Sequence, residues 1–300
     1  MATAYSKVGN FVRGCLGRDG RLLLELSDRN LAQQKAPHSF FLVWDNGRLS
    51  KPIRVLWSTA AIVHTGWPDA EFVAVGTFGQ LMRLRRDGTT SEVTLFRPGH
   101  IAQRGPLRGA ACIGGGLYCV GAAHQALRVA PDWSVTDISI PQQMTSAQPD
   151  SVGLEAVQGF TPEEIYAAGW EGEIWRYAGQ RWQRVGGPTN AILTAIVCAP
   201  DDHVYVVGQQ GTVLVGRGDQ WTPVLSPIKE NLWSAAWFFD ALHASSSQQL
   251  FTMDKGQMRS VELPDQPQSF FWLDSNAKAM LSTGADDVLL LLRDRVLRIV

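Results

Sequence analysis

Short runs of apolar residues, bounded by Gly, Asn or Asp, recur along the whole chain. The stretch Ile165–Trp182 shows the pattern: one apolar run ends at Gly169, a second follows Gly172, and a third begins after Ala178–Gln180. Glycine suits the turns between them because it accepts the positive φ that tight hairpins need. The pattern therefore predicts consecutive antiparallel strands. No run of a dozen residues keeps the helical period without interruption by Gly or Pro.

This strand unit repeats along the chain. The residue before its middle hairpin turn recurs at spacings of 38 to 49 residues, close to the ~40–45 residues of a four-stranded propeller blade. These residues are Ser27, Gly76, Gly121, Gly169, Gly208, Ser246 and Gly284. We predict one all-β domain over 1–300, a seven-bladed β-propeller of four-stranded antiparallel blades. Its blades span about 8–54, 55–97, 104–141, 151–187, 190–226, 231–264 and 267–300.

Each unit opens with a strand of mostly small apolar side chains, as in Arg108–Ile113 and Thr194–Val197. Small side chains fit where strands crowd around a central axis, so we expect these strands to be innermost. The first blade begins near Asn10 with its inner strand, and the last ends at Val296–Val300 with its outer strand. We therefore expect complete blades at both ends, with no strand exchanged between the first blade and the last.

Composition narrows the range of functions. The 300 residues are 45% hydrophobic, enough for a large core, and carry 27 Lys+Arg against 28 Asp+Glu. A net charge of −1 creates no global field toward nucleic acid or anionic lipid, so we expect neither as a partner. There is no apolar run of membrane-spanning length. Four cysteines without metal-binding spacing are typical of a reducing compartment, which predicts a cytoplasmic location.

Residues suited to catalysis occur mainly at repeated positions. A sialidase-like enzyme would need an arginine cluster, an Asp and a Tyr–Glu pair at the central pit. Three tyrosines share one position of the repeat and three arginines share another, which indicates packing: Tyr118, Tyr166, Tyr205, Arg83, Arg128 and Arg176. The six histidines show no metal-binding spacing. We predict no catalytic residues, no metal and no cofactor.

One face of such a propeller would collect the irregular connections. The second-to-third and fourth-to-first strand connections lie together there, and they include Asp28–His38, Arg97–Leu107, Pro141–Val152 and Ser226–Leu232. Long loops on a rigid scaffold are common binding sites, and aromatic residues amid charge suit a protein partner. The predicted partner-binding residues are Phe78, Arg97, His100, Arg104, Arg108, Glu155, Trp170, Glu171, Gln209, Gln210, Glu230 and Trp233.

Charge on this face divides along the sequence. The basic residues of the first half are Arg29, Lys35, Arg97, His100, Arg104 and Arg108. The acidic residues of the second half are Asp150, Glu155, Glu171, Glu230, Asp265, Asp286 and Asp287. In a ring the two halves would face each other, so the order of charges predicts a bipolar surface.

Two resemblances bear on fold and function. The outer turns Asp45–Gly47 and Thr252–Gly256 resemble the Asp-box of neuraminidase repeats, although both lack its Thr-Trp ending. By its repeat, the chain resembles bacterial propellers of the WD-repeat and neuraminidase-repeat type. The segment Tyr166–Trp221 is similar to propellers that are immunity partners of bacterial secreted toxins, including the large Rhs-type toxins of type VI secretion.

The second resemblance implies a non-enzymatic propeller, monomeric when free, that binds and neutralises a cognate bacterial toxin. If the toxin is a nuclease, Glu155, Glu171 and Glu230 would occupy its basic substrate cleft. Two other functions remain open at this point. One is a protein-interaction scaffold or assembly factor, and the other is a sugar-binding or sialidase-like propeller.

Overall fold

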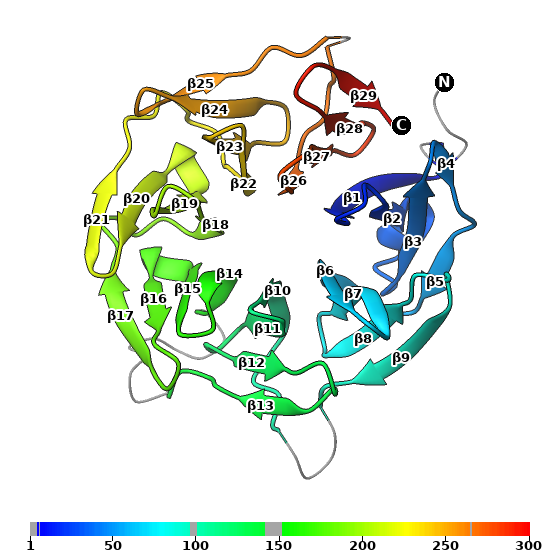
Figure 1. The fold of residues 1–300 in the computed structure, drawn as a ribbon, viewed down its shortest axis with the longest axis horizontal. Helices are drawn as coiled ribbons and strands as arrows, with labels where there is room; N and C mark the ends of the chain where they lie inside the picture. Colours follow the sequence, from blue (N-terminus) through cyan, green and yellow to red (C-terminus); the bar gives the residue numbers. More distant parts are fainter. Residues whose placement is uncertain (1–4, 6, 97–100, 142–151, 265) are drawn as a thin grey trace. The chain divides into compact units, whose positions relative to one another are not determined.

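The computed structural model describes residues 5, 7–96, 101–141, 152–264 and 266–300. Within them, the strands form seven antiparallel sheets, each built from consecutive strands (Figure 1). We number these sheets as blades one to seven in chain order. The chain divides into two compact units, Met1–Ser58 with Val224–Val300 (unit 1) and Thr59–Pro223 (unit 2). The expectation of one domain stays a prediction.

Unit 1 contains blades one, six and seven. Blade one has five strands, because β5 pairs with β3 beyond the short β4. Its strands are β1 (Gly9–Leu16), β2 (Leu22–Asp28), β3 (Ser39–Asp45), β4 (Arg48–Leu49) and β5 (Ile53–Val55). Blade six consists of β22 (Ser234–Phe238), β23 (Ala241–Ser245), β24 (Leu250–Asp254) and β25 (Gln257–Ser260). Blade seven consists of β26 (Trp272–Ser275), β27 (Met280–Thr283), β28 (Val288–Leu291) and β29 (Val296–Arg298).

Blades one and seven pack together without sharing a strand. Strand β1 lies against β26 and β27, and the Leu16 N–H donates to Asp274 Oδ2 over 2.7 Å. The Arg13 guanidinium lies 5.4 Å from the centre of the Trp272 ring. Apolar side chains such as Leu24 and Leu281 fill the space between the two sheets. The prediction of complete first and last blades is confirmed.

Unit 2 contains blades two to five. Blade two is β6 (Thr59–Trp67), β7 (Ala70–Gly76), β8 (Gln80–Leu84) and β9 (Thr90–Thr94), and blade three is β10 (Leu107–Ile113), β11 (Gly116–Gly121), β12 (Ala126–Val129) and β13 (Val135–Asp137). Blade four is β14 (Leu154–Thr161), β15 (Glu164–Gly169), β16 (Ile174–Tyr177) and β17 (Trp182–Gly186). Blade five is β18 (Leu193–Cys198), β19 (Val204–Gly208), β20 (Val213–Arg217) and β21 (Gln220–Pro223).

The first strands of neighbouring blades pack directly on one another in unit 2, as β10 does on β14 and β14 on β18. A Cβ on Gly109 would lie 2.4 Å from the Glu155 carbonyl oxygen, so this approach requires glycine. The repeated tyrosines Tyr118, Tyr166 and Tyr205 are all buried, with at most 7% of their surface exposed. Their predicted packing role is confirmed.

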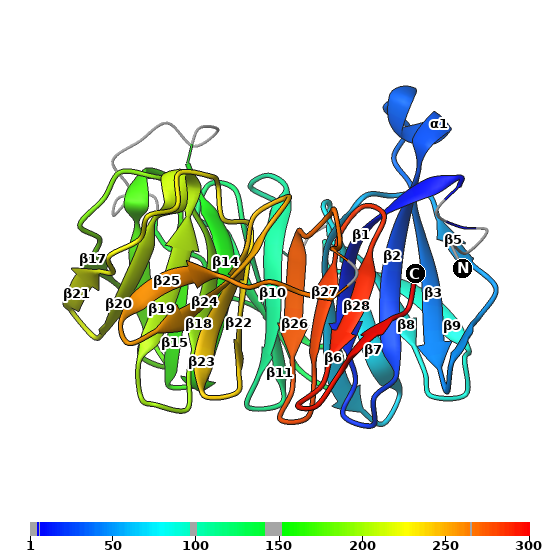
Figure 2. The same ribbon diagram turned by 90° about the horizontal axis from the view of Figure 1, so that it is seen from above.

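The insertion in blade one contains a single helical turn, α1 (Arg29–Gln33), which projects beyond the ends of the strands (Figure 2). Asp28 caps it, since its Oδ1 accepts the Asn30 and Leu31 N–H groups at 2.9 Å. This helix is shorter than any sequence period can reveal. In the described part of the chain, no helix has the length and apolar character needed to cross a membrane.

Candidate functional site

Two tight turns of the same form lie between the second and third strands of blades four and five. They are η3 (Trp170–Gly172) and η4 (Gln209–Gly211). In each, a non-glycine residue in left-handed conformation precedes a left-handed glycine, with φ of 56° at Glu171 and Gln210 and 67° at both glycines. A Cβ on Gly172 would overlap the Thr189 carbonyl oxygen. The last position of η3 therefore requires glycine.

Trp170 is held in place by residues of two blades. Its indole Nε1–H donates to Glu155 Oε1 on β14. Arg108 on β10 donates from Nη1 to the same oxygen over 2.8 Å, and its guanidinium lies 4.9 Å from the Trp170 ring centre. We call Arg108, Glu155 and Trp170 the Trp170 cluster. It fixes the rotamer of an aromatic side chain before any partner arrives, which lowers the entropic cost of binding.

A buried hydrogen-bonded pair, His124 and Glu173, lies beneath this turn. His124 Nε2 is 2.9 and 3.0 Å from the two Glu173 carboxylate oxygens, and the Trp175 indole donates to the same carboxylate. Burial opposes ionisation of Glu173, but the contacts with His124 and Trp175 outweigh it and hold the pKa of this carboxyl below its ordinary value. The Glu173 N–H donates to the Trp170 carbonyl, so the pair also supports the base of η3.

The sequence prediction did not include His124 or Glu173. His124 occupies the position in its blade that Gly172 and Gly211 hold in blades four and five, and it too is left-handed, with φ of 55°. The residue just before or at the start of the third strand is polar in each of the seven blades: Ser39, Gln80, Gln125, Glu173, Thr212, Gln249 and Asp287. That recurrence was the available signal. A polar residue repeated beside a buried strand indicates a satisfied internal contact.

Four other predicted residues lie outside the Trp170 cluster. Phe78 is 58% exposed in the turn between β7 and β8, and its N–H donates to Gln80 Oε1. Arg104 is half-buried and donates from Nη1 to the Ile140 carbonyl over 2.8 Å. In unit 1, Trp233 stacks on Phe271 with ring centres 5.4 Å apart, and Glu230 is exposed.

Of the twelve predicted partner-binding residues, the structure brings Arg108, Glu155, Trp170 and Glu171 together in one place. Gln209 and Gln210 form the tip of the next turn, η4. Arg97 and His100 lie outside the described residues. The partner-binding role of the whole set stays a prediction.

The predicted separation of charges is wrong for the pairs that the structure describes. Arg108 forms an ion pair with Glu155 at 2.8 Å, and Arg29 pairs with Asp286 at 3.2 Å. Asp287 is buried, where it accepts the Gln268 and Ser269 N–H groups. Glu155 and Asp286 therefore each neutralise an arginine of the first half of the chain, and Asp287 accepts hydrogen bonds from the backbone. Asp150 and Asp265 lie outside the described residues.

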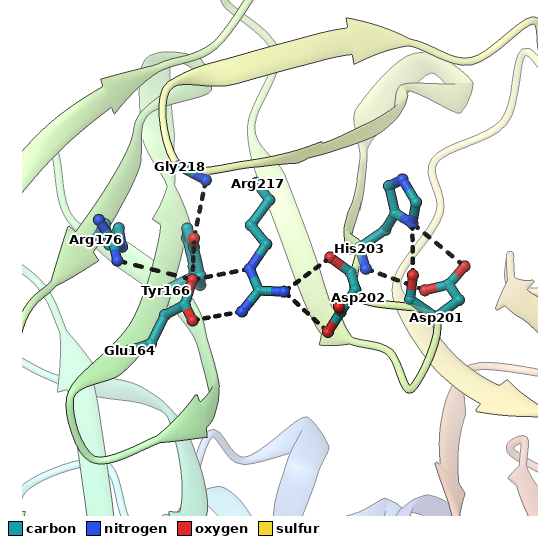
Figure 3. Close-up of polar contacts among 8 residues, drawn as sticks. All are labelled: Glu164, Tyr166, Arg176, Asp201, Asp202, His203, Arg217 and Gly218. Atoms are coloured by element: carbon teal, nitrogen blue, oxygen red, sulfur yellow. Dashed lines mark hydrogen bonds and ion pairs between the residues drawn. The ribbon is translucent and has the colours of Figure 1, made fainter.

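A second polar cluster joins blades four and five at the other end of β15 (Figure 3). Glu164 accepts hydrogen bonds from Arg217 at 2.7 and 3.0 Å and from the Tyr166 hydroxyl at 2.9 Å. Arg217 also pairs with Asp202 at 2.9 Å. The hydrogen bonds from Arg217 hold the pKa of Glu164 below its ordinary value. Arg176 stands 3.8 Å from the same carboxylate, so this repeated arginine has a structural contact, as predicted.

Among the described residues, no group of three or more His, Cys, Asp or Glu side chains is placed to hold a metal ion.

Comparison with solved structures shows the fold. A catalytically inactive virginiamycin B lyase from Staphylococcus aureus, crystallised with quinupristin, superposes with a TM-score of 0.72 at 10% identity over 97% of both chains. YCF48 from Cyanidioschyzon merolae superposes with a TM-score of 0.71 at 12% identity, covering 95% of this chain and 96% of that one. The WD40 propeller domain of Doa1 gives 0.66 at 9% identity, covering 97% and 92%. Together with the seven sheets, these matches confirm the predicted seven-bladed β-propeller.

Comparison of sequences gives a more specific result. No protein-family profile matches the chain. Immune protein Tsi7 of Pseudomonas aeruginosa is 37% identical over 303 residues, which cover 96% of this chain and 95% of that protein.

Proposed function

This chain belongs to the family of immune protein Tsi7, and we propose on that basis that it is an immunity protein that binds a cognate bacterial toxin and neutralises it. The observation that carries the proposal is 37% identity along 96% of the chain. The resemblance to propeller immunity proteins, first noted over Tyr166–Trp221, is confirmed by this relative. Delivery of the toxin by type VI secretion remains part of the proposal.

Neutralisation would proceed by binding, without chemistry on the toxin. The Trp170 cluster supports this mode because an aromatic side chain with a fixed rotamer can contribute binding free energy at little entropic cost. The exposed Phe78 ring adds apolar surface in the turn between the second and third strands of blade two. We also propose a cytoplasmic location and a monomeric free state. None of the four cysteines, all in the described part of the chain, takes part in a disulfide bond, which is compatible with that location.

The exposed carboxylates of the protein bear on the activity of the toxin. Glu171 and Glu230 are exposed, whereas the charge of Glu155 is balanced by Arg108. The two exposed carboxylates are thus the acidic groups best able to face a basic surface. A nuclease presents such a surface where it binds the phosphate backbone. We propose that Glu171 and Glu230 contact the substrate cleft of a nuclease toxin.

The first measurement is a pull-down of the tagged protein from its native host, followed by mass spectrometry. We expect one dominant partner that remains bound at high salt, and we expect co-expression of this chain to protect cells against it. Several weak partners without protection would contradict the immunity function and favour a scaffold.

The second measurement tests the acidic contact. The double variant Glu171→Lys with Glu230→Lys should weaken protection, because both contacts become repulsive. The matched control is Asp219→Lys with Asp294→Lys, which reverses one exposed carboxylate in each unit, between the third and fourth strands of a blade. Equal protection by both double variants would exclude the acidic contact and leave the family assignment intact.

A further inference from the structure

The exposed tips of η3 and η4 have an unfavourable backbone conformation. Glu171 and Gln210 both have φ of 56°, a region where a Cβ crowds the backbone and glycine or asparagine is preferred. Both side chains are exposed, so neither fills the core. Packing therefore does not explain why long polar residues occupy these positions.

A third turn of the same form shows the alternative. In blade three the corresponding residue is Ala123, with φ of 50°, and only 5% of its surface is exposed. The next residue, His124, is also left-handed and points into the buried pair with Glu173. The residue at the tip of this turn has a small side chain in blade three, where the turn is buried. In blades four and five, where the tip is exposed, this residue carries a carboxylate or an amide.

The surroundings of Glu171 and Gln210 indicate which chemical groups of a partner these residues can bind. Among the described residues, the Glu171 carboxylate forms no ion pair. Beside it, the Trp170 ring already packs against the guanidinium of Arg108 at 4.9 Å, and tryptophan is the best side chain for binding cations on its ring. The amides of Gln209 and Gln210 each offer donors and acceptors. η3 also contacts β18, the first strand of blade five, whose second and third strands carry η4 between them.

We propose that η3 and η4, which we call the twin turns, are the specificity-determining contact with the toxin. In this arrangement Glu171 binds a Lys or Arg side chain of the toxin, and Gln209 and Gln210 hydrogen-bond to the polypeptide beside it. The inference rests on the proposed immunity function and deepens it by naming the contact and the partner's charge. It does not depend on the toxin being a nuclease.

The test separates recognition from folding, because glycine relieves the backbone at both tips. Glu171→Gly and Gln210→Gly should unfold at the same denaturant concentration as the wild type or a higher one. Each should bind the toxin at least tenfold more weakly. The probe is the toxin that the wild type retains in the pull-down, purified and titrated by calorimetry. Glu171→Gln keeps the size of the side chain and tests the charge, and we expect about a tenfold loss.

The matched control is Lys255→Gly, in the turn between β24 and β25. Lys255 is exposed, has φ of 48° and is followed by the left-handed Gly256, so its backbone repeats that of Glu171 and Gly172. This variant should gain the same stability and bind the toxin as the wild type does.

The outcomes are distinct. Wild-type affinity in both tip variants would overturn the inference while the immunity function stands. Wild-type affinity in Glu171→Gln alone would overturn the cationic contact. A wild-type protein that binds no toxin would overturn the proposed function, and the inference with it.

Discussion

The two ends of strand β15 make an informative comparison. At the Gly169 end, the Arg108–Glu155 pair joins blades three and four and holds Trp170 in the turn that follows. At the Glu164 end, the pair with Arg217 joins blades four and five, and Arg176 of blade four lies beside the same carboxylate. Both clusters use arginine, glutamate and an aromatic side chain. The first cluster holds Trp170, which precedes the exposed Glu171. In the second cluster, the charged side chains pair with one another (Figure 3).

The difference shows how to separate binding surface from scaffold in this protein. A charged group that is already paired across two blades offers little new interaction energy to a partner, because binding must first break the pair. The informative groups are those that a pair holds in place, such as Trp170, and those beside it that remain exposed, such as Glu171. Substitutions in the buried pair and in the two clusters test this distinction.

The buried pair beneath η3 should be the most sensitive part of this junction. His124→Ala would leave the Glu173 carboxylate buried without its main partner, and removal of one member of a buried pair costs about 3–5 kcal/mol. We expect the free energy of unfolding to fall by this amount in urea titrations. His203→Ala, at an exposed histidine, should change it by less than about 0.5 kcal/mol. Equal losses in the two variants would contradict the assignment of the pair.

The Glu164 cluster should contribute stability with a defined pH dependence. Glu164→Gln should lower the free energy of unfolding at neutral pH by about 1 kcal/mol, because it weakens hydrogen bonds made to a charged group. Since Arg217 lowers the pKa of Glu164, its contribution is complete above the ordinary glutamate pKa and is lost as the pH falls through the lower folded value. Wild type and variant should converge in acid. A stability difference that is constant with pH would exclude this ionisation as the cause.

The Trp170 cluster should affect binding more than stability. Glu155→Gln keeps an acceptor for the Trp170 indole but removes the charge that pairs with Arg108. We expect the free energy of unfolding to change by less than about 1 kcal/mol, while the toxin dissociates several-fold faster because the ring is less firmly held. Glu163→Gln, at an exposed glutamate beyond the other end of β15, is the control and should leave the dissociation rate unchanged.

The fold was largely predictable because each blade repeats the same local pattern. Tyr118, Tyr166 and Tyr205 recur at one position and are buried together with their strands. Thr194–Val197 lies within β18, which packs on the first strand of the neighbouring blade. Hairpin neighbours are close in sequence, so turn residues and apolar periods specify them. The turn α1 escaped prediction because five residues are too few to show a helical period.

The sequence predicted individual residues of the site but not the contacts between them. Arg108, Glu155 and Trp170 were selected separately from their loop positions, but the Arg108–Glu155 pair joins residues 47 positions apart on different sheets. The predicted separation of charges is wrong at Arg29 for the same reason: Arg29 and Asp286 are 257 positions apart in sequence yet form an ion pair between blades one and seven. Order along the chain does not reveal which side chains meet across two blades. His124 escaped notice because it occupies a position where other blades have glycine.

The conformation of the twin turns has a consequence for how this protein can change over generations. Both residues of each turn have a left-handed backbone, but only the glycines, Gly172 and Gly211, are buried, whereas the side chains of Glu171 and Gln210 are exposed. Substitutions at 171 and 210 can therefore accumulate without disturbing the strands on either side. A lineage facing an altered toxin could replace its recognition residues one at a time and keep the same folded framework. The same two positions are the natural place to randomise in a library designed to redirect the protein to a new target.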